Sequence, residues 1–507
     1  MNMTFPRTRI GFRSTLLAGV LMCAGCTVGP DFNMPAAPPQ TAYLAGTPPQ
    51  TTVATDAPFG AAQHFEPGAD IPGAWWTLFQ SRPLNDLIDH ALATNASLEA
   101  AQHALRQAQE NVYAQQGAFF PQISAGFNAS RNKTATSAVS PASASGSPYY
   151  SLHTAQLSVS FTPDVFGLNA RTVESLVAQA DNQKFQLEAT YLTLTSNLVV
   201  AALQEASLRA QIQATEEIIR IDSELTNLLR KQQTLGGIAG SDVAAQETLQ
   251  AQAEQALPPL QKQFAQQRDL LAALSGEPPN VELPQIFDLA QFQLPLALPV
   301  SLPSALVAQR PDVRASAEQL HAASALVGVA VASRLPQFQL SAVGGSQANA
   351  IGSLLTPGTS FWTLAGGVTQ PIFDAGTLLH KERAAREGFE QNVALYRSTV
   401  IAALQNVADA LRALEFDALT LKASVAADVA ATKSLNAAKL QYNAGATSSL
   451  TLLNAQQAYQ TTHIALVQAQ AGRLADTAAL FQALGGGWWN RNDAQDAPRG
   501  SLLSQIQ

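Results

Sequence analysis

The sequence lacks the long apolar run that a membrane-spanning helix requires. Beyond an N-terminal export signal, no stretch reaches the roughly 18 to 20 consecutive apolar residues that cross a bilayer as a helix. Charged residues make up only 13% of the chain and aromatic residues only 7%, which argues against a compact core rich in aromatic residues. If this protein crosses a membrane, it must therefore cross as β-strands.

Catalytic and nucleic-acid-binding motifs are also missing. The seven histidines are scattered, and the sequence contains neither His-Glu-x-x-His, nor Gly-x-Ser-x-Gly, nor a phosphate-binding glycine loop. The formal net charge is −8, and no basic cluster follows a helix face. We therefore predict that the protein is not an enzyme, that it binds no nucleic acid and that it holds no metal.

Only two cysteines occur, and both lie near the N-terminus. Three arginines precede an apolar stretch over residues 16–22, which leads to Cys23-Ala24-Gly25-Cys26. This order is typical of a bacterial export signal over residues 1–25 that ends at a lipidated cysteine, although Cys23 stands where Leu is usual. A redox or metal pair is the alternative, but no partner ligand lies nearby. We predict a covalent lipid on Cys26 and no other cofactor.

The chain contains the same unit twice, over residues 82–276 and 302–486. Each copy shows a short helix, two alternating strands joined by a polar loop, a very long helix, a break with glycine and a shorter helix. A Pro- and Thr-rich segment, residues 26–81, precedes them and should run extended and irregular over the surface. Residues 277–301 join the copies, and residues 487–507 form a tail.

Strict period-two alternation predicts four strands, at about 121–131, 152–163, 336–346 and 360–371. Apolar residues alternate with Ser, Thr, Gln and Asn, and each run has roughly the length of a membrane-crossing strand. Strands of a soluble β-sandwich would show the same alternation of apolar and polar residues. The uncharged polar sets and the Gly- and Ser-rich loops favour strands with one face toward lipid and one toward a lumen.

Four strands cannot close a barrel, because the smallest membrane barrels have about eight and an open edge in lipid leaves backbone groups unpaired. The chain must therefore oligomerise to form a pore. Two copies would give eight strands and three would give twelve, and both numbers remain open on physical grounds.

Two long helices are expected, over residues 167–235 and 376–442, each on the order of 100 Å long. Heptad spacing such as Val400, Leu404, Val407 and Leu411 predicts coiled-coil packing. The shorter helices 82–117 and 241–275 together match one long helix if they stack end to end. One heptad-spaced row of apolar residues would fit an ordinary helical bundle equally well. Two matched rows, each on a long helix joined to a strand hairpin, favour a helical tube.

The breaks at residues 236–241 and 443–449 are predicted to be the turns of the two helical hairpins at the far end of the tube. Glycine permits the left-handed residue that ends a helix, and Ser or Thr caps the next helix. We expect the bore to narrow there, with acidic rings that select against anions; a first-turn carboxylate favoured by the helix dipole is the alternative for Asp242. The candidate gate residues are Gly237, Gly240, Asp242, Glu247, Gly445, Thr447 and Thr451.

Several longer motifs occur together. They are Cys26-Thr-Val-Gly-Pro-Asp-Phe32, Trp75-Trp76-x-x-Phe79, Arg310-Pro-Asp-Val-Arg314 and Pro371-Ile-Phe-Asp-Ala-Gly376. On these residues the whole mature chain resembles the outer-membrane factors of tripartite efflux systems, TolC-like proteins, and specifically their NodT or OprM-type lipoprotein branch. The family often shows Leu-Asp-Val-Leu after each tip glycine. Here Asp242 keeps the acid in the first hairpin, while Thr451 replaces it in the second.

The resemblance implies a membrane protein of mixed α and β structure. It implies a homotrimer with a twelve-stranded barrel in the outer membrane of a Gram-negative bacterium, continued by a periplasmic helical barrel and lipid-anchored through Cys26. The implied partners are a periplasmic adaptor, or membrane fusion protein, and an inner-membrane pump, commonly of the resistance-nodulation-division type.

The predicted function is a passive exit duct that conducts small molecules, such as drugs or other toxic compounds, to the outside. The pump supplies the energy, so the choice of substrate should lie upstream. Two alternatives are a duct that serves a type I protein-secretion system and a lipid-anchored coiled-coil scaffold without a lumen. The scaffold predicts a monomer or dimer.

Overall fold

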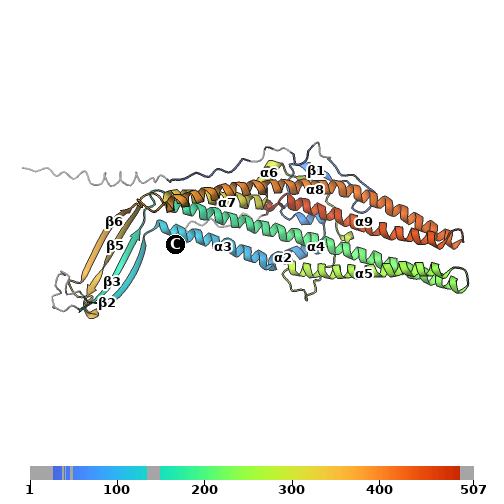
Figure 1. The fold of residues 1–507 in the computed structure, drawn as a ribbon, viewed down its shortest axis with the longest axis horizontal. Coiled ribbons are helices and arrows are strands. Elements are labelled where there is room, and N and C mark those ends of the chain that lie inside the picture. The colour runs from blue at the N-terminus through green and yellow to red at the C-terminus, as the bar shows by residue number, and fades with distance from the viewer. Residues whose placement is uncertain (1–26, 37–38, 40–41, 46–49, 134–148, 492–507) are drawn as a thin grey trace, which may run out of the picture.

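The computed structural model describes residues 27–491, except for 37–38, 40–41, 46–49 and 134–148. The predicted signal peptide, Cys26 and residues 492–507 of the tail lie outside this range. A four-stranded sheet forms one end of the molecule, and long helices extend from it to two hairpin turns at the opposite end (Figure 1). Among the described residues, no helix carries an apolar window long and uncharged enough to span a bilayer.

The sheet contains four antiparallel strands in the order β2-β3-β5-β6. Their ends differ from the sequence-based ranges by at most a few residues; for example, β3 begins at Tyr149, where alternation placed the start near 152. The strands are β2 (Gln122–Lys133), β3 (Tyr149–Phe161), β5 (Gln337–Ala348) and β6 (Ser360–Thr369). Among the residues that the structure describes, β2 and β6 each have one edge without a partner strand.

One face of this sheet is apolar and exposed. The register places Ala125 opposite Leu157, Leu157 opposite Gly344, and Gly344 opposite Trp362, so these residues share a face. Trp362 is 76% exposed, and the large apolar residues on this face are Ile123, Phe127, Leu157, Leu340, Trp362, Leu364 and Val368. A contiguous apolar surface of this kind requires a cover of lipid or protein.

Two helical hairpins of matched length form the long body. The helices α4 (Leu168–Thr234) and α8 (Thr377–Asn443) each have 67 residues, which is about 100 Å of helix. They turn back into α5 (Gly240–Leu274) and α9 (Ser449–Ala483), each of 35 residues. The remaining helices are α2 (Arg82–Thr94), α3 (Ala96–Gln116), α6 (Pro303–Gln309) and α7 (Pro311–Ala332). Short 3₁₀ turns occupy Trp75–Phe79, Gly117–Phe119, Leu289–Gln291, Ile351–Ser353 and Trp488–Asn490.

The helix expected over residues 82–117 is two helices that meet at Asn95. The Asn95 side chain accepts hydrogen bonds from the backbone N–H groups of Ser97 and Leu98, so it caps α3 and ends α2 in the same place. Beyond this break, α3, α2 and α5 follow one another along α4 (Figure 1). Stacked short helices thus match one long helix.

The helices form a wall with a fixed order. The stack of α3, α2 and α5 contacts α4, α4 contacts α7 and α9, and these in turn contact α8. The flanks of the wall are therefore the α3-α2-α5 stack and α8. Since β2 follows α3 and β6 precedes α8, the open edges of the sheet and of the wall lie on the same two sides.

The main hydrophobic core lies in the middle of the molecule, where the N-terminal segment and the linker meet the wall. Trp75 is buried and stacks on Phe481 of α9, with ring centroids 5.5 Å apart. The strand β1 (His64–Pro67) pairs in parallel with β4 (Ala297–Val300). The prediction that residues 26–81 run only over the surface is wrong here, because Gln63 is fully buried. Four-residue strands are too short to show a period in the sequence.

Candidate functional sites at the helical tips and at residues 27–32

Both long helices end in the same backbone turn. Gly236 and Gly445 adopt left-handed conformations, with φ of 74° and 71°. The N–H of Gly237 donates to Gln232 O at 2.8 Å, and in the second hairpin the N–H of Ala446 donates to Gln441 O at 2.8 Å. These bonds satisfy carbonyl groups that a helix end otherwise leaves open.

The sequence predicted a left-handed glycine in each turn without assigning which glycine has this role. Gly236 has it in the first hairpin and Gly445 in the second. Gly237 instead supplies the N–H that closes the turn, and Gly240 is the first residue of α5.

The predicted Ser or Thr caps form at one hairpin only. Ser448 is the N-cap of α9, and its Oγ accepts a bond from the N–H of Thr451 at 3.4 Å. Thr447 precedes this cap. The first hairpin has Ala239 at the N-cap of α5 without a side-chain bond, so the prediction of a hydroxyl cap is wrong there.

The two predicted acidic residues have different electrostatic surroundings. Glu247 Oε1 on α5 forms an ion pair with Arg230 on α4, at 2.6 Å from Nη2 and 2.9 Å from Nε. An exposed pair of this kind adds little stability, but it cancels the charge of Glu247. Asp242 lies in the first turn of α5 and has no salt bridge within the described residues. Asp242 is therefore the tip carboxylate that keeps its charge uncompensated.

A contact between the hairpins lies near the tips. The Tyr442 hydroxyl on α8 donates to Gln232 Oε1 on α4 at 2.6 Å. Burial, followed by the charge of Asp242, raises the pKa of Tyr442, so the hydroxyl keeps its proton for this bond. No local sequence pattern indicates this contact, because the two residues are 210 positions apart.

A buried carboxylate also joins the hairpins. Asp222 of α4 is fully buried, and its Oδ2 accepts a bond from Gln460 Nε2 of α9 at 2.9 Å. Gln246 Nε2 of α5 lies 3.4 Å from Oδ1. Burial raises the pKa of Asp222 to about 6, against the lowering effects of the two amides and of Lys439. Its carboxyl group therefore changes charge at mildly acidic pH.

Asp222→Asn should remove a pH dependence of stability. The folded pKa lies above the ordinary value near 3.9, so wild-type stability is full below that value and falls as pH rises through about 6. We expect a loss on the order of 1–2 kcal/mol between pH 4.5 and 7.5, which the neutral Asn variant lacks. Thermal unfolding followed by helical circular dichroism measures this. Asp242→Asn, which removes a half-buried carboxylate outside this contact, should keep the wild-type slope, and an unchanged slope in Asp222→Asn would contradict the assignment.

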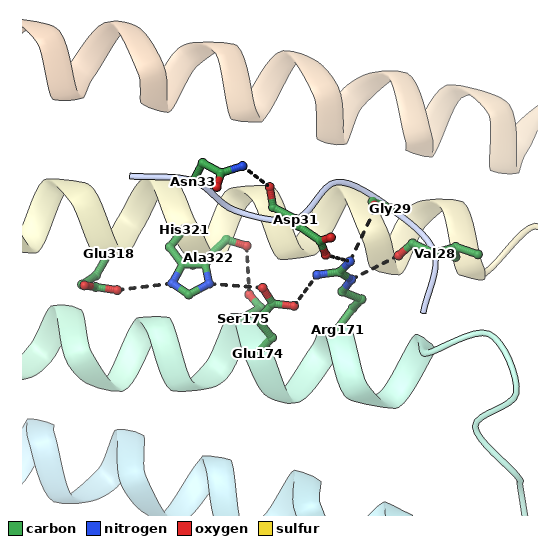
Figure 2. A network of polar contacts seen from close by, with 10 residues as sticks. All are labelled: Val28, Gly29, Asp31, Asn33, Arg171, Glu174, Ser175, Glu318, His321 and Ala322. Atoms are coloured by element: carbon green, nitrogen blue, oxygen red, sulfur yellow. Dashed lines mark hydrogen bonds and ion pairs between the residues drawn. The ribbon is translucent and has the colours of Figure 1, made fainter. Parts of the chain in front are cut away.

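The first described residues dock on the helices beside the sheet (Figure 2). Arg171, in the first turn of α4, is buried and holds this segment. Its Nε donates to Val28 O at 3.1 Å, and its Nη2 lies 2.7 Å from Asp31 Oδ1. Nη1 binds Glu174 at 2.7 Å, so Arg171 donates hydrogen bonds to both its own helix and the segment.

Close backbone packing completes this docking site. A Cβ added to Gly29 would lie 2.4 Å from Gly328 Cα of α7, so the two glycines allow the chains to touch. Phe32 stacks on His321, with ring centroids 4.4 Å apart and planes 12° apart. His321 lies between Glu318 and Glu174 (Figure 2).

The segment begins at the boundary between sheet and helices. A Cβ on Gly167, the N-cap of α4, would lie 3.0 Å from Thr27 Cα, and the N–H of Val28 donates to Phe166 O. Gly167 follows the end of β3 by six residues, since 167 − 161 is 6. Thr27 is therefore fixed at the level where the strands give way to helices.

Comparison with known proteins agrees with this architecture. The family model "Outer membrane efflux protein" matches residues 87–277 and 302–486. The efflux pump outer membrane protein TtgC of Pseudomonas putida is 28% identical over 500 residues, which cover 96% of this chain and 99% of TtgC. The pyoverdine export outer membrane protein OpmQ of Pseudomonas aeruginosa is 28% identical over 437 residues, which cover 84% and 89%.

Solved structures share the fold. The open state of the MtrE channel of Neisseria gonorrhoeae is 26% identical, with a TM-score of 0.78 and coverage of 93% of this chain and all of that one. The outer-membrane channel OprN is 24% identical, with a TM-score of 0.80 and coverage of 91% and 100%. The predictions of a mixed α and β channel fold and of an efflux function are thereby confirmed. This chain belongs to the outer membrane efflux protein family.

Proposed function

We propose that three copies of this chain assemble into one continuous duct, which passively conducts small organic molecules from a periplasmic adaptor and an inner-membrane pump to the outside. The observation that carries this proposal is the pair of open edges on matching flanks. One rotation that pairs β6 with β2 of the next copy also brings α8 beside the next α3-α2-α5 stack. Closing the sheet and closing the helical wall are therefore the same event.

The need for a bore favours three copies over two. Each copy brings four strands, so two copies would close an eight-stranded barrel, whose interior side chains largely fill. Twelve strands enclose more space. The inward face then consists of residues such as Gln122, Ser160 and Ser341, which lie opposite one another across β2, β3 and β5. An uncharged polar lining suits a conduit for varied solutes.

The position of residues 27–32 supports a lipid on Cys26. Thr27 lies against Gly167 at the boundary between strands and helices, which in the assembled duct is the inner surface of the outer membrane. A diacylglycerol on the preceding residue would have only one residue of chain to cover before reaching lipid. We infer a lipid-anchored outer-membrane protein whose tips extend into the periplasm, where an adaptor and a pump of the resistance-nodulation-division type would meet them.

The choice of substrate should lie outside this chain. Relatives named for toluene efflux, antibiotic efflux and pyoverdine export in Pseudomonas putida are each 28% identical to it. Proteins that are equally similar to this chain are thus named for the export of different compounds. The duct supplies a sealed path, and the pump supplies energy and selection.

The proposed gate is the ring of tips, with Asp242 as its charged residue. Three copies would bring three Asp242 carboxylates toward one axis, while Glu247 is neutralised by Arg230. The turns that shape this ring contain the other candidates, Gly237, Gly240, Gly445, Thr447 and Thr451. Thr451 lies next to Ser448 in the second hairpin, with their hydroxyl oxygens 3.2 Å apart.

Ion selectivity in planar bilayers tests both the duct and the gate. We expect Asp242→Asn to lower the cation-to-anion permeability ratio about twofold or more, because a ring of charge concentrates counter-ions. Thr451→Asp, which adds a second acid, should raise it. Reversal potentials measured in a salt gradient report both changes.

Two outcomes would contradict these proposals separately. If pores form but Asp242→Asn leaves the reversal potential unchanged, the gate assignment is wrong. If purified wild-type protein and tip variants yield no pores at any voltage, the duct itself is wrong. Thr451→Val, which removes a hydroxyl but no charge, is the matched control and should keep the wild-type ratio.

A further inference from the structure

The internal repeat contains the geometry of the contact between copies. We propose that β6 of one copy pairs with β2 of the next in one register, with Val368 opposite Phe127 of the partner subunit. This inference rests on the proposed ring and deepens it, because the pore is incomplete until this seam between β6 and β2 forms.

The two hairpins of the sheet are equivalent residue by residue. Gln122 of β2 lies opposite Ser160 of β3, and Gln337 of β5 lies opposite Thr369 of β6. The first strands are thus related by 337 − 122 = 215 positions and the second strands by 369 − 160 = 209. The second offset also relates Gly167 to Gly376, the left-handed N-caps of α4 and α8. The equivalence therefore extends from the strands into the helices.

The pairing of β3 with β5 already joins the first repeat to the second. A closed ring must also join the second repeat to the first repeat of the next copy, and equivalent units give equivalent joints. Within the chain, Val159 lies opposite Ala342. Adding 209 to 159 gives Val368, and subtracting 215 from 342 gives Phe127. The neighbouring pair Ser160 and Ser341 becomes Thr369 and Gly126 in the same way.

The chemistry of the two edges agrees with this register. Val368 and Phe127 are 61% and 57% exposed, and both belong to the apolar face of the sheet. A slip of one residue would place one apolar face against the other strand's polar face. The derived register keeps the apolar face continuous around the ring, as lipid requires.

Exposed apolar residues at the helix end of both edges support the same seam. Ile372 and Phe373 follow β6 and are 91% and 90% exposed, while Phe119 and Phe120 precede β2 and are 41% and 52% exposed. Continuing the register past the strand ends brings Ile372 level with Ile123 of the partner subunit. The most exposed apolar residues of one edge thus meet the apolar residues of the other, and both lose contact with water.

Cysteine pairs test the register directly. The Phe127→Cys, Val368→Cys double variant should give covalent dimers and trimers when membranes are oxidised, and a reducing agent should return them to monomers. Residues directly opposite each other have Cβ atoms about 4.5–5.5 Å apart, whereas diagonal neighbours are about 7 Å apart and outside disulfide reach. Phe127→Cys with Gly366→Cys, which shifts the pairing by two residues on the same face, should therefore cross-link at least about tenfold less.

The repeat supplies a matched positive control. Val159→Cys with Ala342→Cys is the equivalent pair within one chain, so it should consume its thiols without forming multimers. This control shows that oxidation reaches strands in the membrane and that such pairs are accommodated. Native electrophoresis of each variant establishes separately whether the ring has assembled.

Three results would overturn the inference. One is stronger cross-linking of the shifted pair, and another is an assembled ring without cross-links while the control pair oxidises. If the apolar pair prevents assembly, Gly126→Cys with Thr369→Cys tests the polar face, where a Cβ at Gly126 meets no atom within 4 Å. The third contradicting result is an assembled ring in which the Gly126→Cys, Thr369→Cys pair does not cross-link. A wild-type protein that never oligomerises would instead refute the proposed duct, and the seam with it.

Discussion

Arg473→Met should lower the free energy of unfolding by about 3–5 kcal/mol, because it removes one partner from a buried charged network. Arg473 of α9 is fully buried and donates to Phe59 O and Ala61 O, each at 2.8 Å. It also donates to Thr52 Oγ1 at 3.0 Å. Without these donors, the carbonyl groups of Phe59 and Ala61 lose their bonds from Arg473, while Thr52 Oγ1 keeps the bond from the Gln63 N–H. Urea denaturation followed by circular dichroism measures the loss.

A second consequence concerns two acids near Arg473. Burial and the neighbouring Asp476 raise the pKa of Asp417 to about 7, while the charge of Arg473 lowers it. Arg473→Met should therefore raise that pKa further. Arg473→Lys keeps a positive charge but loses the forked geometry, so its effect should be intermediate. Arg82→Met removes an exposed arginine and serves as the control. Wild-type stability in Arg473→Met would show that other contacts hold the N-terminal segment.

The sheet and the long helices were predictable because their periods extend over many residues. A strand such as β2 alternates over its full length, and each misplaced residue would move an apolar side chain to the polar face. The 67 residues of α8 repeat the heptad often enough to fix its face. The ends of these elements were less certain, since capping depends on single residues such as Asn95.

Contacts between distant segments could not be predicted from local patterns. Residues 236–240 contain three glycines, and only the backbone angles of the folded turn identify Gly236 as the left-handed one. The pair of Arg230 and Glu247 had a usable signal: both lie about equally far from the turn, so a hairpin brings them together. The buried Asp222 had none, because its partner Gln460 lies 238 positions away.

The burial of the N-terminal segment in the central core was not predictable from the sequence. Arg473 appears in the sequence as one more charged residue of a helix, yet it is fully buried against Thr52, Phe59 and Ala61. The Pro-rich composition of residues 26–81 indicated an extended chain at the surface. Composition could not show that part of this segment would be buried. Its backbone polar groups accept hydrogen bonds from Arg473 of α9, far along the sequence.

Arg171→Ala should release residues 28–32 from the helices while the helical body keeps its stability. Arg171 is 4% exposed, whereas the Asp31 side chain is 91% exposed. The substitution removes the bonds from Arg171 to Asp31 and to Val28 O in the segment, and the bond to Glu174 in its own helix. We expect a local cost of about 2 kcal/mol, which corresponds to roughly 30-fold faster hydrogen exchange at the Val28 N–H, the amide of this segment that donates to Phe166 O. Exchange followed by mass spectrometry measures it.

The control variants distinguish loss of docking of residues 28–32 from loss of stability of the whole fold. Glu174→Gln removes the charge of Glu174 but leaves the contacts from Arg171 to the segment, so exchange in residues 28–32 should rise much less. Gly328→Val should also release the segment, because the new Cβ would lie 2.9 Å from Arg171 Cγ and 3.1 Å from Val28 O; it displaces the Arg171 side chain but keeps its charge. If both Arg171→Ala and Gly328→Val leave exchange at the wild-type rate, the segment is held by other contacts. Faster exchange in both would show that the packing of Arg171 against Gly328 holds residues 28–32 on the helices.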